Sequence, residues 1–176
     1  YIKIKGIWNY IWLFISTTSK VVTGYHLSNS RGIKPAIAVM TETLRTVKEN
    51  QKIQLITDGN PSYQAGLHFI NQNNKGLNAE IKNVIGLQNL DETSKQNRPY
   101  KQTVERLNRT YKYHTQSQNG FGNFKGAMAK LVLFVTYYNF LRPHKSLGYR
   151  TPVELNELSG IVFIQNKWLK IISLAA

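Results

Sequence analysis

The chain of 176 residues has no cysteine and no long apolar run, and these absences exclude several classes of protein. Without cysteine, disulfide bonds and thiolate metal sites cannot form, which favours a reducing compartment such as the cytoplasm. The longest apolar stretch, Ile7–Ile15, contains Asn9 and is far shorter than the roughly 20 residues of a membrane-spanning helix, so we expect no membrane partner. The four histidines lack the spacing of zinc ligands: His26, His68, His114 and His144.

Acidic residues are also scarce. The chain has 9 Asp plus Glu against 23 Lys plus Arg, which gives a net charge of +14. The basic residues are spread along the chain and do not gather in a tail, so we expect a folded basic surface that binds a polyanion. The length suits one domain, and 41% hydrophobic residues are enough for a folded core.

Hydrophobic periodicity predicts three strands followed by alternating helices and strands. The first three strands, at residues 1–5, 7–15 and 20–27, are separated by short turns, which predicts an antiparallel meander. The predicted helices cover residues 33–47, 62–74, 101–112, 123–138 and 152–158, and two more strands cover residues 51–57 and 82–85. The polar residues 86–100 are predicted to form a loop. This order indicates an α/β layered fold with a mixed sheet.

Asp58 directly follows the apolar strand at residues 51–57 and precedes Gly59, Asn60 and Pro61. Such a turn exposes a carboxylate at the carboxyl end of a strand, where ligands collect in α/β sheets. An Asp-Gly turn is also common without any function. However, the chain has only two aspartates, so an acid at this place in a basic protein is a candidate metal ligand.

The predicted helix Lys101–Lys112 carries a second candidate acid. At about 100° per residue, one carboxylate shares a face with amide and basic groups: Glu105, Asn108, Arg109 and Lys112. The opposite face is a seam for core packing: Val104, Leu107, Tyr111 and His114. The helix is therefore either an ordinary amphipathic surface helix, or one that offers a metal ligand beside groups that bind phosphate.

Three sequence blocks occur in a recognisable order. Thr57-Asp58-Gly59-Asn60 is followed by Val104-Glu105-Arg106-Leu107-Asn108-Arg109 with Lys112. Tyr138-Asn139-Phe140-Leu141-Arg142-Pro143-His144-Lys145-Ser146-Leu147 comes next, with Thr151-Pro152-Val153-Glu154-Leu155. Together they resemble the catalytic core of DDE transposases and retroviral-type integrases, and are most similar to bacterial insertion-sequence transposases. The resemblance covers residues 1 to about 158, and the Asn-x-x-Arg-Pro-His block is its most specific part.

The resemblance implies a ribonuclease H-like fold, with a mixed five-stranded sheet flanked by helices, in which three carboxylates bind two Mg²⁺ or Mn²⁺ ions. One ion activates water or a DNA 3′-hydroxyl, and the other stabilises the leaving oxygen. Asp58 matches the second carboxylate and Glu105 the third. Asn108, Arg109 and Lys112 match positions that face DNA.

The same resemblance implies transposon ends and target DNA as partners, a homo-oligomer assembled on DNA, and a nucleoid-associated place in the bacterial cytoplasm. The first carboxylate of the family lies on the opening strand, just before the sequence that Tyr1–Gly6 resembles. No aspartate precedes Asp58 in this chain. We therefore expect the first acid to lie upstream of Tyr1, and the chain as given to be catalytically impaired.

Glu92 is an alternative for the last acid, because its distance from Asp58 is closer to the usual spacing of the family. We favour Glu105, since it lies on an amphipathic helix with the basic and amide residues in phase, whereas Glu92 falls in the predicted loop.

Arg142, His144 and Lys145 form a basic cluster around Pro143. Two interpretations stay open: the cluster lies near DNA, or Arg142 and His144 brace the loop by hydrogen bonds.

We predict an integrase-like catalytic core at residues 1–158 and a C-terminal tail at residues 159–176. The expected function of the parent is DNA transposition by metal-dependent cleavage and strand transfer, with this chain a truncated or inactive fragment. The alternatives are a non-catalytic nucleic-acid-binding remnant and a ribonuclease H-like nuclease. No helix-turn-helix precedes the first strand in the sequence given, so end recognition is expected to lie elsewhere.

Overall fold

The computed structural model describes residues 1–47, 51–73, 79–84 and 92–176. The first three strands are β1 (Ile2–Ile4), β2 (Ile7–Ile15) and β3 (Val22–Ser28), and they form an antiparallel sheet in the order β1-β2-β3. The turn between β1 and β2 places Lys5 at φ 49° and Gly6 at φ 79°, the positive values that a tight two-residue hairpin needs. The predicted meander is therefore confirmed.

A second, two-stranded parallel sheet contains β4 (Ile53–Thr57) and β5 (Ala79–Asn83). The strands lie in two sheets, three in one and two in the other, so the single five-stranded sheet of the prediction is not found among the described residues. The last strand also starts three residues earlier than the predicted 82–85, and residue 85 lies outside the described residues.

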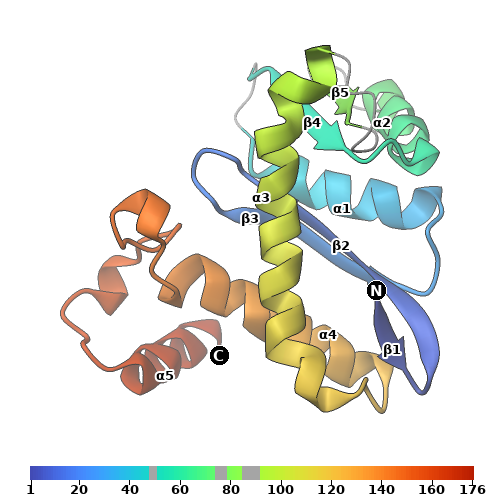
Figure 1. Cartoon of the computed structure of the whole chain (residues 1–176). Coiled ribbons are helices and arrows are strands. Elements are labelled where there is room, and N and C mark those ends of the chain that lie inside the picture. Colours follow the sequence, from blue (N-terminus) through green and yellow to red (C-terminus); the bar gives the residue numbers. More distant parts are fainter. Residues whose placement is uncertain (48–50, 74–78, 85–91) are drawn as a thin grey trace.

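The described residues form five α-helices (Figure 1): α1 (Ile33–Arg45), α2 (Pro61–Asn73), α3 (Glu92–Thr115), α4 (Phe124–Thr136) and α5 (Ile164–Ala175). The loop predicted at residues 86–100 is wrong from residue 92 onward, because α3 begins there. The polar first half of α3 is rich in Glu, Lys, Gln and Arg, which are strong helix formers. A polar segment therefore need not be a loop. Residues 86–91 lie outside the described residues.

Side chains alternate along β2, so this strand contributes to two cores on opposite faces of the sheet. Leu13 and Ile15 belong to the core formed with α3 and α4, whereas Trp12 belongs to the core formed with α1, α2 and β4. The second core thus contains side chains from both sheets, Trp12 of β2 and Leu55 of β4. Its other members come from α1 and α2: Ala36, Val39, Met40, Leu44, Leu67 and Ile70. Figure 1 shows α3 running across one side of the sheets, from β4 and β5 down to α4, and α1 packing on the other side.

Gly24 lets α1 lie close against β3. A Cβ added at this glycine would meet Thr43 Oγ1 at 2.3 Å and the carbonyl oxygen of Val39 at 2.6 Å. Real Cβ atoms do not approach backbone this closely, so the position requires glycine.

After α4 the chain continues as a π-helical turn, η2 (Tyr137–Leu141), and as short 3₁₀ turns. These turns are η3 (Lys145–Leu147) and η4 (Asn156–Leu158), whereas a further 3₁₀ turn, η1 (Gln116–Gln118), lies between α3 and α4. The helix predicted at residues 152–158 is therefore wrong except for η4. In the segment before η4, Val153 N donates a hydrogen bond to Asn139 O (2.9 Å), which ties this segment to η2.

The predicted C-terminal tail contains a complete helix, α5, in which no residue is buried. In the part of the chain that the structure describes, no helix combines the length and apolar character that crossing a bilayer requires.

Candidate functional site

Asp58 stands at the end of β4, as predicted. Gly59 follows with φ 84°, a left-handed conformation that turns the chain sharply towards α2. The Asp58 Oδ1 accepts a hydrogen bond from Asn60 N (3.3 Å), and Asn60 Oδ1 accepts one from Ser62 N (3.0 Å) in the first turn of α2. These bonds fix the turn and leave the Asp58 side chain 53% exposed.

Arg31 lies beside Asp58, which the sequence did not indicate. Its Nη2 is 3.7 Å from Asp58 Oδ2, and its Nη1 donates to the Tyr1 hydroxyl at 2.8 Å. The guanidinium carbon also lies 5.7 Å from the centre of the Tyr1 ring and 6.0 Å from that of Tyr10. Because Ser62 Oγ donates to Arg31 O (2.8 Å), the loop before α1 is tied to the start of α2, and the arginine stays near the acid.

The phase predicted for Lys101–Lys112 is found in α3. Glu105, Asn108, Arg109 and Lys112 are exposed, whereas Leu107 and Tyr111 are buried in the core formed with α4 and Val104 packs against it. His114 departs from the prediction, because it is exposed, although its ring lies near aromatic neighbours such as Tyr137, at 5.7 Å between ring centres. The helix therefore presents the Glu105 carboxylate on a solvent-facing side.

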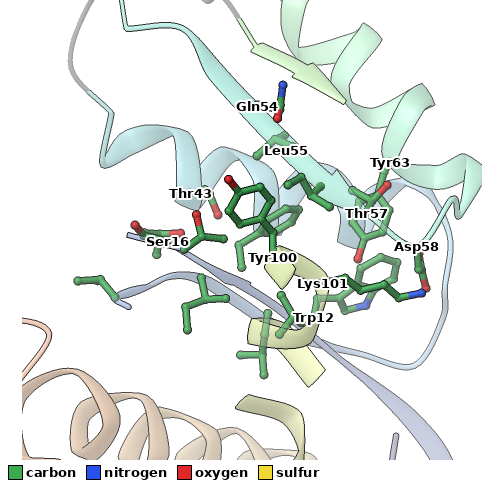
Figure 2. A pocket seen from close by; sticks show the side chains of 18 of the residues that line it. Trp12, Ser16, Thr43, Gln54, Leu55, Thr57, Asp58, Tyr63, Tyr100 and Lys101 are labelled. Carbon is green, nitrogen blue, oxygen red and sulfur yellow. The ribbon is translucent and has the colours of Figure 1, made fainter. Parts of the chain in front are cut away.

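A cavity of about 980 Å³ lies between the two sheets, and both candidate acids are among its lining residues. Asp58 from the end of β4 and Glu105 from α3 both line it, as do Asn108 and Lys112. Figure 2 shows Asp58 and Lys101 at one end of this cavity and Ser16 at the other. Arg109 is exposed and is not one of the lining residues.

Tyr63 lies at the Asp58 end of the cavity, and its pKa depends mainly on burial and to a smaller extent on nearby charges. Burial and, to a smaller extent, the negative charge of Asp58 raise the pKa of Tyr63 to about 12, against the opposing positive charge of Arg31. The Tyr63 ring meets the Trp12 ring edge-on at 5.5 Å between centres. Tyr63 is therefore a neutral hydroxyl beside the acid at physiological pH.

Glu92, the alternative last acid, lies at the first residue of α3. Its Oε2 is 3.8 Å from Lys95 Nζ, its side chain is 76% exposed, and it is not one of the residues that line the cavity. Asp91 lies outside the described residues. The geometry therefore favours Glu105 over Glu92 as the partner of Asp58.

The residues present fit a divalent ion only in part. Two carboxylates from different elements share one cavity, and hard oxygen ligands of this kind suit Mg²⁺ or Mn²⁺. However, no cluster of three or more His, Cys, Asp or Glu side chains able to hold a metal occurs among the described residues. Arg31 also pairs with Asp58 and would compete with a cation. The three-acid site that the resemblance implies is thus not formed by these residues.

The distal basic cluster does not reach the cavity. Arg142 Nη1 donates to Thr110 Oγ1 on α3 (3.4 Å), and its guanidinium lies 5.4 Å from the centre of the Tyr138 ring. His144 lies edge-on to the same ring at 4.6 Å, and its Nε2 is 3.3 Å from Tyr138 O. These contacts fit the interpretation in which Arg142 and His144 brace the loop, while Lys145 is exposed.

Burial lowers the pKa of His144, and the positive charges of Arg142 and Lys20 lower it further, against the opposing effect of the contact with Tyr138 O. The imidazole is therefore neutral at pH 7, which makes it a weak partner for phosphate.

Asn139 is a residue of the Asn-x-x-Arg-Pro-His block to which sequence reasoning gave no role. Its side-chain amide is buried and forms two hydrogen bonds with the backbone of Val22, more than 100 positions away in the chain. A buried asparagine within an apolar stripe was the available signal, because such a group needs partners.

Residues 92–152 match the family model described as Integrase core domain. The matched segment contains α3, α4 and the distal basic cluster, and it includes Glu105 but not Asp58. No curated protein and no solved structure matches the chain. The match at residues 92–152 supports a DDE-type integrase or transposase catalytic core.

Proposed function

We propose that this chain is the catalytic core of a protein that cuts and joins DNA strands in transposition, with Asp58 and Glu105 as two of its three acids. The observation that supports this best is that the two acids come from elements far apart in sequence and line one cavity. A chance pair of surface acids has no reason to converge in a chain with so few carboxylates.

The exposed side of α3 is proposed as the DNA-facing surface. Asn108, Arg109 and Lys112 lie there next to Glu105, and amide and basic groups of this kind bind phosphates. Lys145 is proposed to extend this surface, on a loop held in place by Arg142 and His144. Because the reaction joins transposon ends to a target, we further propose that the protein acts as a homo-oligomer on DNA, within the bacterial cytoplasm and near the nucleoid.

Domains of the integrase family typically use divalent metals. Bound Mg²⁺ or Mn²⁺ would supply Lewis-acid activation of the attacking and leaving oxygens. The chain's own contribution is then to hold the carboxylates of Asp58 and Glu105 at one cavity and to hold DNA phosphates along α3. A third acid, on a strand upstream of Tyr1, is part of the proposal.

A second candidate is a non-catalytic nucleic-acid-binding domain. It is favoured by the ion pair between Arg31 and Asp58 and by the lack of a three-acid cluster among the described residues. This candidate keeps the basic surface but needs no metal.

A nicking assay separates the two candidates. In a form extended upstream of Tyr1 by an acid-bearing strand, we expect Mg²⁺-dependent nicking of duplex DNA. Glu105→Gln should lower this activity by at least about a hundredfold, since a ligand to the ions is lost. Glu92→Gln, an equal change on the same helix, should leave it unchanged. Equal activity of the two variants, or activity without the added strand, would contradict the assignment of Asp58 and Glu105 as two of three catalytic acids.

A further inference from the structure

Trp8 is exposed at the hairpin end of the three-stranded sheet, beside the turn at Lys5 and Gly6. Its side chain is 55% exposed. Lys3 of β1 lies directly opposite Trp8 in the antiparallel ladder, so the strand next to this ring is present and leaves it open to solvent. The exposure of Trp8 is therefore a property of the hairpin itself.

Trp8 is the end of a row of aromatic rings with cations between them. The Tyr1 ring meets Trp8 and Tyr10 edge-on, at 6.5 Å and 5.1 Å between ring centres. Lys3 Nζ lies 4.9 Å from the centre of the Trp8 ring. The guanidinium carbon of Arg31 lies 5.7 Å from the centre of the Tyr1 ring. Single exposed apolar side chains are common on protein surfaces, but this aromatic row is a continuous patch.

The aromatic row lies on the opposite face of the sheet from α3. Because side chains alternate along β2, Trp8 shares a face with Tyr10 and Trp12. Trp12 belongs to the core formed with α1, α2 and β4, and Tyr10 packs against it, whereas α3 and α4 cover the other face of the sheet. Figure 1 shows α1 and α3 on these two sides. The aromatic row is therefore separate from the side of α3 that is proposed to bind DNA phosphates.

The charge around the aromatic row suits a polyanion. Lys3, Lys5 and Arg31 are all exposed, and Arg31 also pairs with Asp58 at the far end of the row. Aromatic faces beside basic groups are a common means of holding the bases and phosphates of a single strand. In duplex DNA the bases are stacked on one another and closed to a protein ring, so the aromatic row favours an unpaired strand.

We propose that the aromatic row binds single-stranded nucleic acid, with a base stacked on Trp8 and phosphates held by Lys3 and Lys5. Since every base has a stacking face, this binding should tolerate any sequence. The proposal goes beyond the proposed function, because it needs no metal, no third acid and no contact with α3. Failure of the nicking assay would leave it standing, and its own failure would leave the proposed function standing.

The test compares two strands of equal length, about eight nucleotides, at one salt concentration. One is oligothymidine, and the other is an abasic strand that keeps the sugars and phosphates but has no bases. In a fluorescence anisotropy titration of the labelled strands, the full chain should bind oligothymidine at least about fivefold more tightly, because only that strand can stack on Trp8. Trp8→Ala should abolish this preference, whereas Trp8→Phe, which keeps a ring, should retain a preference of at least about twofold.

Two further variants separate stacking from charge and from a general loss of aromatic surface. Lys3→Gln should weaken the binding of both strands alike, since both carry phosphates. Phe163→Ala is the matched control, because it removes an aromatic side chain that is 68% exposed ahead of α5. It should leave both affinities as they are in the unmodified chain.

Equal binding of the two strands by the unmodified chain would overturn the proposal, and so would a preference for oligothymidine that persists in Trp8→Ala. Blunt duplex DNA gives an independent check, since its bases cannot stack on the row. Trp8→Ala should leave the affinity for this duplex unchanged. An equal loss of duplex and single-strand affinity in Trp8→Ala would assign Trp8 to a duplex-binding surface and would also overturn the proposal.

Discussion

The side-chain amide of Asn139 pairs with the backbone of Val22 as a neighbouring strand would. Asn139 Oδ1 accepts from Val22 N at 2.9 Å, and Asn139 Nδ2 donates to Val22 O at 3.0 Å. The asparagine is 6% exposed, and its own carbonyl oxygen accepts from Val153 N at 2.9 Å. One residue in the π-helical turn after α4 thus joins the start of β3 to the segment near residue 153.

Asn139→Ala should therefore destabilise the protein strongly. It leaves the N–H and C=O of Val22 without their partners in a buried place, and each such loss costs about 1–3 kcal/mol. We expect the free energy of unfolding in urea to fall by about 2–5 kcal/mol. Asn166→Ala, on the exposed surface of α5, removes the same amide and should change stability by less than about 0.5 kcal/mol. Similar effects of the two substitutions would show that the Asn139 bonds do not stabilise the fold.

The elements that local pattern determines were predictable from the sequence. The strands β1 to β3 alternate and are separated by turn residues, and α1 and α2 have clear helical periodicity, so these elements were placed within a few residues. The first half of α3 was missed because its residues are polar on all sides. The separation of β4 and β5 from the other sheet was missed because strand pairing depends on contacts between distant segments, which no local pattern encodes.

Some features of the candidate site were also predictable from local sequence pattern, and others were not. The side of α3 that carries Glu105, Asn108 and Lys112 follows from helical periodicity, and the exposure of Asp58 follows from its turn. Arg31 had no sequence signal, because its place beside Asp58 depends on the packing of the loop before α1 against the start of α2. Such a neighbour can be found only once the chain is folded.

Removal of Arg31 should strengthen the binding of a divalent ion to the candidate site. Its guanidinium lies 3.7 Å from Asp58 Oδ2 and competes for that oxygen, but the pair is half exposed and is worth only about 0.2–1 kcal/mol. In a calorimetric titration with Mn²⁺, Arg31→Gln should therefore bind up to about fivefold more tightly. Arg45→Gln, which breaks the ion pair with Glu42 on α1, is the matched control and should have no effect.

A double-mutant cycle with Asp58→Asn and Arg31→Gln tests whether the arginine acts through this carboxylate. If the arginine acts through this carboxylate, its removal should no longer increase affinity once Asp58 is gone. An increase that persists in the double variant would mean that the arginine repels the ion from another position.

Binding to duplex DNA should depend strongly on salt. With about six phosphate contacts, a fourfold rise in salt lowers the observed association constant about a thousandfold. Arg109→Gln should weaken binding to all sequences and reduce the salt slope by about 1, because one phosphate contact is lost. Lys170→Gln on α5 removes an equal charge far along the chain from α3 and should leave the slope unchanged. A small salt dependence of the unmodified chain would contradict phosphate binding along α3.

Tyr111 carries a buried hydroxyl that has no hydrogen-bond partner in the described part of the chain. The residue is 3% exposed, and its ring packs edge-on against Phe134 at 5.0 Å between ring centres. Tyr111→Phe keeps this ring contact and removes the unsatisfied group, so we expect the free energy of unfolding to rise by about 1 kcal/mol at pH 7. Tyr113→Phe, where the side chain is exposed, should change it by less than about 0.5 kcal/mol.

The same hydroxyl should make the protein sensitive to high pH. Burial raises the pKa of Tyr111 from its ordinary value of 10 to about 12. Between these values the unfolded chain loses this proton and the folded chain keeps it, so stability is complete below pH 10 and falls as the pH rises towards 12. Urea unfolding measured across this range should show a shallower decline for Tyr111→Phe than for the unmodified chain. Parallel curves would mean that the phenol of Tyr111 ionises as readily in the folded protein as in the unfolded one.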